Sequence, residues 1–402
     1  MKNNNIVITG IGIIAPNGCG KEHFWRSLES GCSGIKPIKM FSTKLFKSKT
    51  AAQIDNFNAE DFIEKKGSKK PNRSAALLCS AAKLALEDAG IVIKGKNVDE
   101  IGVCVATTLT NLRSFVKFSK NIFKGEPLFV DPALFPETLL NLVSSELSIY
   151  FNIQGFNTTI STGFTASLDA VKYASVLIRS GHAKCVLVGA VEEITPWSFE
   201  GFYRAGFLSG AEGREVSRPF DLRRNGAVMG EGAAAIILED ERYAVRRKAN
   251  IYASILGQGS YFGNKTEGMQ KSILKAMKNA SVSLEAIDYI SASANSTQQL
   301  DAMESVAINK VFKKCAAKVP VSSIKSMVGE IYSAAGLFQV IGALGMIKRK
   351  FIAPNINYKK KDPACDLKVV ANKSIHRKIK TVLINNFSFA GNNTCAIIAG
   401  HN

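Results

Sequence analysis

Short hydrophobic runs alternate along the chain with longer segments in which hydrophobic residues recur every three or four positions. Runs such as Val186–Val188 and Ala235–Leu238 are apolar at every position, which is typical of strands covered on both faces. Because such strands are interspersed with helical patterns, the sequence predicts an α/β fold with layered sheets. The predicted strands are Asn5–Ile13, Ile101–Thr107, Phe156–Ser161, Cys185–Val191, Ala233–Leu238, Ile251–Gln258, Tyr289–Ala292, Val319–Ser322, Thr381–Asn386 and Thr394–Ala399.

Other segments have the spacing of helices that bury one face. In Ser74–Ala89 the apolar residues lie three and four apart, and Gly90 follows as a stop signal. Segment Asn111–Phe135 has no clear period, and we expect it to form an irregular cap. The remaining predicted helices are Leu139–Tyr150, Thr165–Ser180, Asp301–Phe312 and Ala334–Ile347.

Two similar segments indicate an internal duplication. Gly230–Ala233 leads into one apolar strand, and Gly391–Thr394 leads into another near the C-terminus. A charged, helix-like stretch, Glu239–Lys248, lies between the two halves. The sequence therefore predicts two related halves, residues 1–245 with the cap insert and residues 246–402.

Composition narrows the class of protein. The 402 residues are 46% hydrophobic, enough to bury a large core, and no apolar run approaches the roughly 20 residues of a membrane span. The N-terminal segment lacks the apolar region and cleavage site of a signal peptide. The eight cysteines show no CxxC spacing, which disfavours a zinc or redox motif. We therefore expect a cytoplasmic protein without metal, cofactor or membrane contact.

The net charge of +19, from 52 basic and 33 acidic residues, points to an acidic partner because long-range attraction speeds docking. The basic residues are spread along the chain without a nucleic-acid-binding motif. We therefore expect no nucleic-acid partner, and an acidic carrier protein is the other candidate. A basic surface without any partner is the alternative.

Several blocks taken together resemble the β-ketoacyl-acyl carrier protein synthases of the thiolase superfamily, in order and spacing from about residue 4 to residue 400. They are Val7–Gly12, Ser217–Asp221, Gly226–Ala233, Ile324–Gly329 and Asn385–Asn393. The resemblance implies the five-layered αβαβα thiolase fold, built as a pseudo-duplicated pair. It also implies a tight dimer in which the strand Phe156–Ser161 pairs across the interface.

These synthases use one cysteine and two histidines. The cysteine thiolate takes an acyl chain from a carrier protein, and the histidines stabilise the enolate formed when a malonyl thioester loses carbon dioxide. The resemblance places the cysteine at Phe164, the first histidine at Ser293 and the second at Glu330. A phenyl ring cannot attack a carbonyl, a serine hydroxyl is never cationic, and a carboxylate repels an enolate. Catalysis by the family's route is therefore excluded.

The chain's histidines do not restore the missing pair in another register, because all four lie outside these blocks: His23, His182, His376 and His401. Lys325, Asp301 and Glu304 remain, and we expect them to form a structural ion network around the former site. Gln339 stands where the family has an acidic residue. Phe389 corresponds to the family's gating phenylalanine, between a serine and an alanine where the family prefers glycines.

A chain that keeps the scaffold but loses all three catalytic residues resembles the chain-length factor, the β subunit of type II polyketide ketosynthases. Such a factor pairs with an active ketosynthase α subunit, and the growing chain enters a tunnel that ends at their interface. Those factors often carry glutamine at the cysteine position, so Phe164 departs from their common pattern. By resemblance, the tunnel end follows Ile101–Thr107, with ordinary interface packing as the alternative reading. The candidate tunnel residues are Leu109, Leu112, Phe115 and Val116, at helix-like spacing, and Phe135.

Two other functions remain open. One is a free-standing acyltransferase that uses Ser293 or Glu330 on the same fold, which predicts a stable homodimer with its own activity. The other is a scaffold that recruits acyl carriers through its basic surface. A scaffold predicts carrier binding that is lost at high salt, with no effect on any product.

Overall fold

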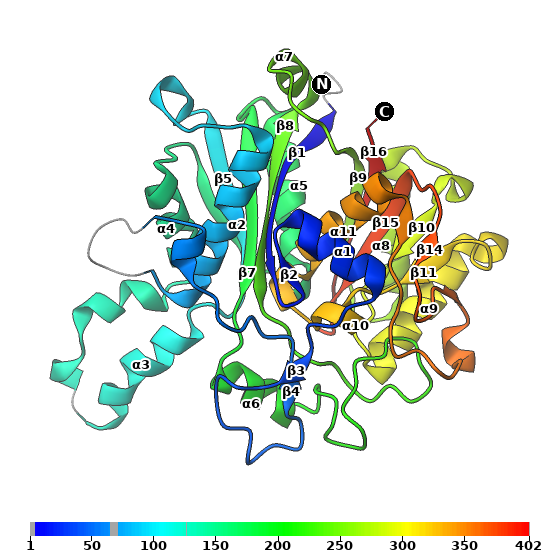
Figure 1. Cartoon of the computed structure of the whole chain (residues 1–402), viewed down its shortest axis with the longest axis horizontal. Coiled ribbons are helices and arrows are strands. Elements are labelled where there is room, and N and C mark those ends of the chain that lie inside the picture. Colours follow the sequence, from blue (N-terminus) through cyan, green and yellow to red (C-terminus); the bar gives the residue numbers. More distant parts are fainter. Residues whose placement is uncertain (1–4, 65–70, 126, 402) are drawn as a thin grey trace.

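The chain folds into five layers, as the resemblance predicts. The computed structural model describes residues 5–64, 71–125 and 127–401 (Figure 1). Two sheets enclose a pair of buried helices, and further helices cover the outer face of each sheet. The inner layer is α5 (Ala166–Arg179) with α11 (Ala335–Arg349), and the outer layers are α2 (Arg73–Ala89) with α4 (Leu142–Phe151) and α8 (Thr266–Ala280) with α9 (Gln298–Phe312).

The two sheets repeat one strand order, which confirms the predicted duplication. In each sheet three parallel strands are followed by two antiparallel ones. A short ladder between Ile6–Ile8 and Ala253–Ile255 joins the sheets. The first order is β6 (Asn157–Ile160), β5 (Ile101–Ala106), β7 (Cys185–Glu192), β8 (Gly232–Asp240), β1 (Ile6–Ala15). The second is β11 (Pro320–Ser322), β10 (Tyr289–Ser291), β15 (Thr381–Phe387), β16 (Asn392–Gly400), β9 (Ala253–Phe262), with β13 (Lys368–Val369) beside β11.

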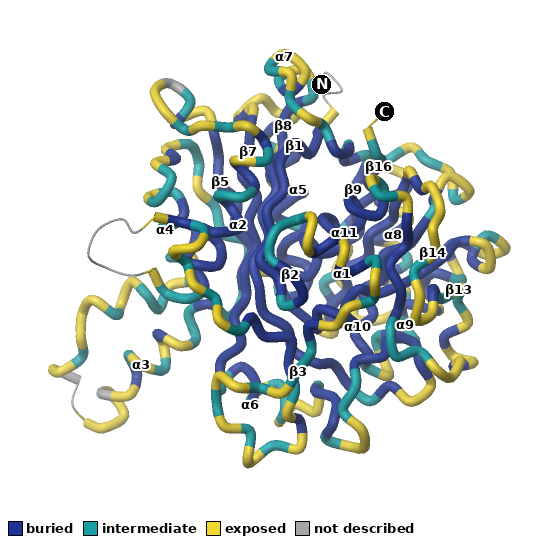
Figure 2. Tube along the Cα trace, in the orientation of Figure 1, coloured by how far each residue is buried: buried dark blue, intermediate teal, exposed yellow. Residues whose placement is uncertain are grey.

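Close packing of helices on the sheets explains the glycines in β1. A Cβ atom at Gly12 would lie 1.8 Å from the carbonyl oxygen of Ala81 in α2, so a larger residue would push the helix away. The central strands β7 and β8 are buried along their whole length, as expected from their uninterrupted apolar runs. Figure 2 shows this buried core running through both sheets and the two inner helices.

The predicted elements are largely confirmed, with two differences. Each predicted strand and helix has a counterpart within a few residues. The prediction of an irregular cap over Asn111–Phe135 is wrong in its first half, because α3 (Leu112–Phe123) is a regular helix. The sequence analysis also did not identify α1 (Lys21–Ser30) or α8. The other elements are α6 (Pro196–Arg204), α7 (Glu241–Arg246), α10 (Lys325–Val328), β2 (Gly18–Cys19), β3 (Lys36–Pro37), β4 (Thr50–Ala51), β12 (Phe351–Ile352) and β14 (Ile375–His376).

Helix α3 and the turns after it form an arm, residues 112–125 and 127–139, that projects from the body beside the first sheet (Figure 1). Most of the described arm is exposed or half-buried, in contrast to the core (Figure 2). Strand β6 lies at the open end of the first sheet, next to β5, and none of its residues is fully buried.

Across the described ranges, no helix is long and apolar enough to cross a membrane. The same residues include no group of three or more His, Cys, Asp or Glu side chains placed to hold a metal ion. All eight cysteines are free thiols.

Candidate functional site

The site that the sequence predicts lies where strands of both sheets end. Phe164 follows β6 in a single 3₁₀ turn, Gly163–Thr165, at the start of α5. Gly163 has a φ of 70°, a conformation that costs glycine little and lets the chain turn sharply into the helix. In this position a side chain points at the N-terminus of a helix, where a thiolate would be stabilised. The residue there is a phenylalanine that is 3% exposed.

Phe164 belongs to an aromatic cluster that fills the space around it. Its ring centroid lies 5.3 Å from that of Tyr332, 5.4 Å from that of Phe389 and 5.8 Å from that of Phe207. Phe202 completes the aromatic cluster, with its centroid 4.5 Å from that of Tyr332. Such contacts are individually small but add up in a packed interior. The position that the sequence analysis assigns to the nucleophile is therefore occupied by apolar rings.

Ser293 lies at the end of β10 with its side chain already engaged. Its Oγ accepts a hydrogen bond from the Phe387 N–H at 2.9 Å and donates to the Phe387 carbonyl at 3.4 Å. The side chain is buried. A hydroxyl with both roles taken by the backbone of β15 supports that strand and cannot also donate to a substrate oxygen.

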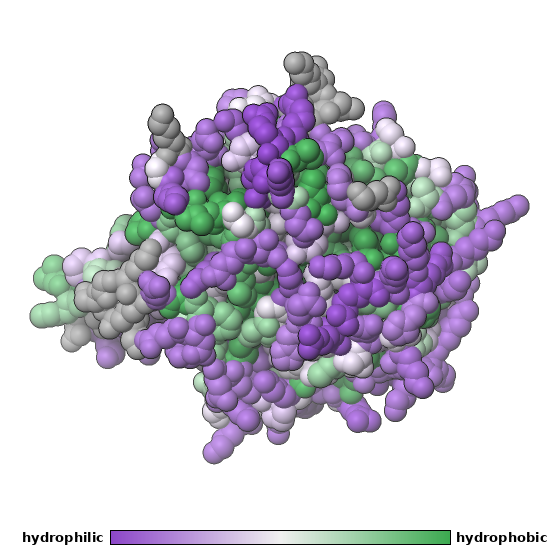
Figure 3. Space-filling model, turned by 45° about the horizontal axis from the view of Figure 1, so that its top comes forward, coloured by the Kyte–Doolittle hydropathy of each residue, from purple (hydrophilic) through white to green (hydrophobic). Residues whose placement is uncertain are grey.

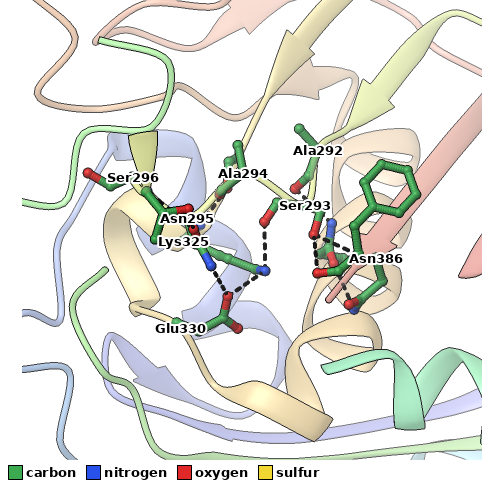
Figure 4. A network of polar contacts seen from close by, with 12 residues as sticks. Ala292, Ser293, Ala294, Asn295, Ser296, Lys325, Glu330 and Asn386 are labelled. Carbon is green, nitrogen blue, oxygen red and sulfur yellow. Dashed lines mark hydrogen bonds and ion pairs between the residues drawn. The ribbon is translucent and has the colours of Figure 1, made fainter. Parts of the chain in front are cut away.

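Glu330 forms a buried ion pair with Lys325, the residue that opens α10. Lys325 Nζ lies 2.8 Å from Glu330 Oε2 and donates to the Ser293 carbonyl at 2.7 Å. Asn295 Nδ2 donates to the same carboxylate oxygen at 2.9 Å. Figure 4 shows these contacts as one chain of polar groups from Ser293 through Lys325 to Glu330. The predicted role of Lys325 in a structural network is consistent with these contacts, and its partner is the residue that replaces the second histidine.

The two acidic residues of α9 hold the loop after β10. Asp301 accepts from the Asn295 and Ser296 N–H groups, and Glu304 accepts from the Ser293 N–H at 2.9 Å. Burial raises the pKa of Glu304 to about 7 and that of Asp301 to about 6, against the opposing effect of these hydrogen bonds. Gln339 of α11 donates to backbone carbonyls on the same side, including that of Ala292 at 2.9 Å. These groups fix the loop and face away from any substrate.

A groove of about 450 Å³ leads from the surface to the aromatic cluster. Phe202, Phe207 and Phe389 line the groove and also belong to the cluster. The Phe389 side chain is 57% exposed, so it stands at the entrance. A substrate that entered here would meet phenyl rings, and the described residues that line the groove include no cysteine and no histidine.

The histidines lie where the sequence analysis expects them, away from this site, and all four are on the surface or near a terminus. The candidate tunnel residues gather around the base and one side of the arm. Leu109 precedes α3, and Leu112, Phe115 and Val116 lie within it. Phe115 and Phe135 are each more than half exposed, and the Phe135 ring lies 6.1 Å from that of Phe118.

Sequence reasoning missed three members of the aromatic cluster and one carboxylate. Phe202, Phe207 and Tyr332 come from segments far apart in the chain, and no motif links them to Phe164. Tyr332 did carry a signal, because it comes two residues after the replaced histidine position. The carboxylate is Glu192, which is described below.

Comparisons with known proteins identify the family of the chain. A model of the β-ketoacyl synthase N-terminal domain matches residues 3–244, and a model of the C-terminal domain of the same enzymes matches residues 249–359. A 3-oxoacyl-[acyl-carrier-protein] synthase 2 of Coxiella burnetii is 31% identical over 99% of both chains. The tetracenomycin polyketide synthase ketoacyl synthase alpha subunit of Streptomyces glaucescens is 32% identical over 98% of this chain and 96% of that one.

Solved structures with similar folds include paired ketosynthases. The ishigamide ketosynthase/chain length factor superposes with a TM-score of 0.91 at 30% identity, covering 99% of this chain and 100% of that one. A type II polyketide synthase acyl-carrier protein in complex with its ketosynthase bound to the hexaketide gives a TM-score of 0.89 at 28% identity, covering 99% of this chain and 100% of that one.

Proposed function

The chain belongs to the β-ketoacyl synthase family, and we propose that it is a non-catalytic chain-length factor that pairs with an active ketosynthase of a type II polyketide synthase. The observation that carries the proposal is the aromatic cluster around Phe164. It fills the place of the nucleophile with a ring that cannot form a thioester. The similarity to a ketosynthase/chain length factor and to a type II polyketide ketosynthase complex supports the same role.

The exposed apolar surface of the arm supports a protein partner. Phe123 and Leu128 are 88% and 94% exposed, and hydrophobic side chains gather at the projecting end of the molecule (Figure 3). Contiguous apolar surface of this kind marks an interaction site in a soluble protein. The edge strand β6 offers unpaired backbone groups near the same side. Both features are explained if a ketosynthase subunit covers them.

The chain's charge supports the second proposed partner, an acidic acyl carrier protein. A net charge of +19 attracts an acidic domain over distances of about a Debye length, roughly 8–10 Å at moderate salt. The carrier would deliver its acyl group to the active subunit of the pair.

The geometry disfavours a free-standing enzyme that uses Ser293 or Glu330. The Ser293 hydroxyl is engaged by the backbone of Phe387, and Glu330 is paired with Lys325. Both residues are buried, so little of either side chain lies within reach of an incoming thioester.

An intact-mass experiment tests the proposal. The purified pair is incubated with an acyl-loaded carrier protein, and each subunit is weighed by mass spectrometry. We expect an acyl adduct on the active ketosynthase alone, lost when that subunit's cysteine is replaced by alanine. Polyketide formation should require both subunits. A stoichiometric acyl adduct on the chain described here would overturn the proposal.

A further inference from the structure

A single buried carboxylate holds the base of the arm. Glu192 is the last residue of β7 and is 1% exposed. Its Oε1 accepts hydrogen bonds from the Thr108 N–H and the Ser333 hydroxyl, both at 2.6 Å, and its Oε2 accepts from the Leu109 N–H at 3.1 Å. Two consecutive peptide N–H groups and a hydroxyl thus converge on one side chain. Burial raises the pKa of the Glu192 carboxyl to about 7, while these three hydrogen bonds act in the opposite direction.

These contacts join two functional regions. Thr108 and Leu109 lie between β5 and α3, where the arm leaves the body. Ser333 follows Tyr332, whose ring packs 5.3 Å from that of Phe164 in the aromatic cluster. Glu192 therefore connects the segment that closes the former active site with the segment from which the arm begins.

The arm's position depends on its base because little else covers it (Figure 2). Helix α3 has 12 residues and is about 18 Å long, so a small tilt at the base displaces Leu112 slightly and the far end much more. The neighbouring Glu193 provides a different link, a side-chain contact at 3.3 Å to Arg113, whose guanidinium is half exposed. Glu193 itself is buried, but a contact to the end of a long side chain restrains the backbone less directly than bonds to peptide N–H groups.

An amide cannot replace this carboxylate. Glutamine has one acceptor oxygen, and its NH₂ group would face another donor among the Thr108 N–H, the Leu109 N–H and the Ser333 hydroxyl. At least one buried peptide donor would lose its partner. Glu192→Gln is therefore a substitution of nearly equal size that removes the link while leaving the packing in place.

We propose that Glu192 is a specificity-determining positioning residue that fixes the base of the arm and thereby the point at which the growing acyl chain is stopped. This inference rests on the proposed function of the chain as a chain-length factor. It adds a buried residue outside the tunnel wall to those that set product length.

The first experiment measures how strongly Glu192 holds the Thr108 and Leu109 N–H groups, by hydrogen–deuterium exchange on the full chain in the pair. In Glu192→Gln, the amides of Thr108 and Leu109 should exchange about tenfold faster or more, because local opening becomes easier. Peptides from β8 and α2 should be unchanged. Glu193→Gln is the matched control, since it removes the same charge one residue away and should leave these two amides as they are. Unchanged exchange in Glu192→Gln would overturn the proposed link.

The second experiment measures the products of the reconstituted pair by mass spectrometry. Glu192→Gln should give a longer or broader product distribution with the pair still associated, and Glu193→Gln should give the parent distribution. Ser333→Ala, which removes one donor from Glu192, should shift products in the same direction by less. Faster exchange with an unchanged product would overturn the specificity role. If the parent pair makes no product, the proposed function fails. The exchange experiment still decides whether Glu192 holds the base of the arm.

Discussion

At the scale of residues, the positions that the resemblance assigns to the catalytic residues are occupied by side chains with structural contacts. Phe164 packs against an aromatic ring, and Glu330 pairs with Lys325. Ser293 ties β10 to β15. Each replacement makes contacts that stabilise the fold, which is the expected outcome when a pocket no longer needs to open to a substrate.

The aromatic cluster predicts a stability difference between two phenylalanines. Phe164→Ala should lower the free energy of unfolding by about 3–5 kcal/mol, because a buried ring leaves a cavity. Phe389→Ala should cost roughly 1 kcal/mol or less, since much of that ring is already in water. Denaturant unfolding of both variants checks this. Equal losses would show that Phe164 is not a core residue.

The Lys325–Glu330 pair predicts strong coupling. Lys325→Met alone should cost about 3–5 kcal/mol, because it leaves a buried carboxylate without its cation. Glu330→Leu alone should be costly for the converse reason. The double variant should lose clearly less than the sum of the two, and a double-mutant cycle measures the difference. Additive losses would contradict a direct pair.

Glu304 predicts a pH dependence of stability. Its folded-state pKa of about 7 lies above the ordinary value of 4.5, so its neutral form is favoured by folding. Its contribution is fully present below about pH 4.5 and is lost as the pH rises through 7. Glu304→Gln should therefore gain stability relative to the parent between pH 5 and pH 8, by up to about 3 kcal/mol. Unfolding curves at both pH values check this, and a parallel dependence in the two proteins would contradict it.

At the scale of elements, the proposed function gives the arm the role of setting product length. Leu112 opens α3, and Phe115 lies one turn further on a largely exposed helix. Phe115 is more than half exposed, which is consistent with a face that meets another subunit. We propose that the acyl tunnel ends at this face.

Shortening these side chains should lengthen the product. Leu112→Ala or Phe115→Ala removes bulk from a packed tunnel end and leaves space for at least one more extension unit. Product masses from the reconstituted pair measure the change. Lys117→Ala, on an exposed position of the same helix, is the control and should give the parent product. Parent product lengths in both test variants would remove these residues from the tunnel.

The sequence predicts the core strands and helices well, because a buried element shows a regular pattern of apolar residues. The apolar runs of β7 and β8 and the spacing in α2 reflect burial along the whole element, so one-dimensional patterns are enough. The replaced positions follow from the order of short motifs. By contrast, the neighbours of Phe164 and the bonds of Glu192 join segments far apart in the chain. Nothing local distinguishes Glu192 from an ordinary buried residue, and Tyr332 is marked only by its place two residues after Glu330, so only the folded arrangement identifies their contacts.

At the scale of the whole molecule, a basic chain with a closed pocket and an exposed apolar arm is explained best as one half of a pair. Its two-sheet core is complete, but its edge strand β6 and its arm are left uncovered. An active ketosynthase with the same fold would cover both and supply the chemistry that this chain has lost.

The most direct measurement is the mass of the assembly. The chain is expressed alone and together with an active ketosynthase from the same pathway, and each preparation is analysed by size-exclusion chromatography with light scattering. The account predicts a one-to-one heterodimer that forms on co-expression and a chain that is poorly soluble or unstable alone. A stable homodimer that does not bind the ketosynthase would contradict the proposed pairing.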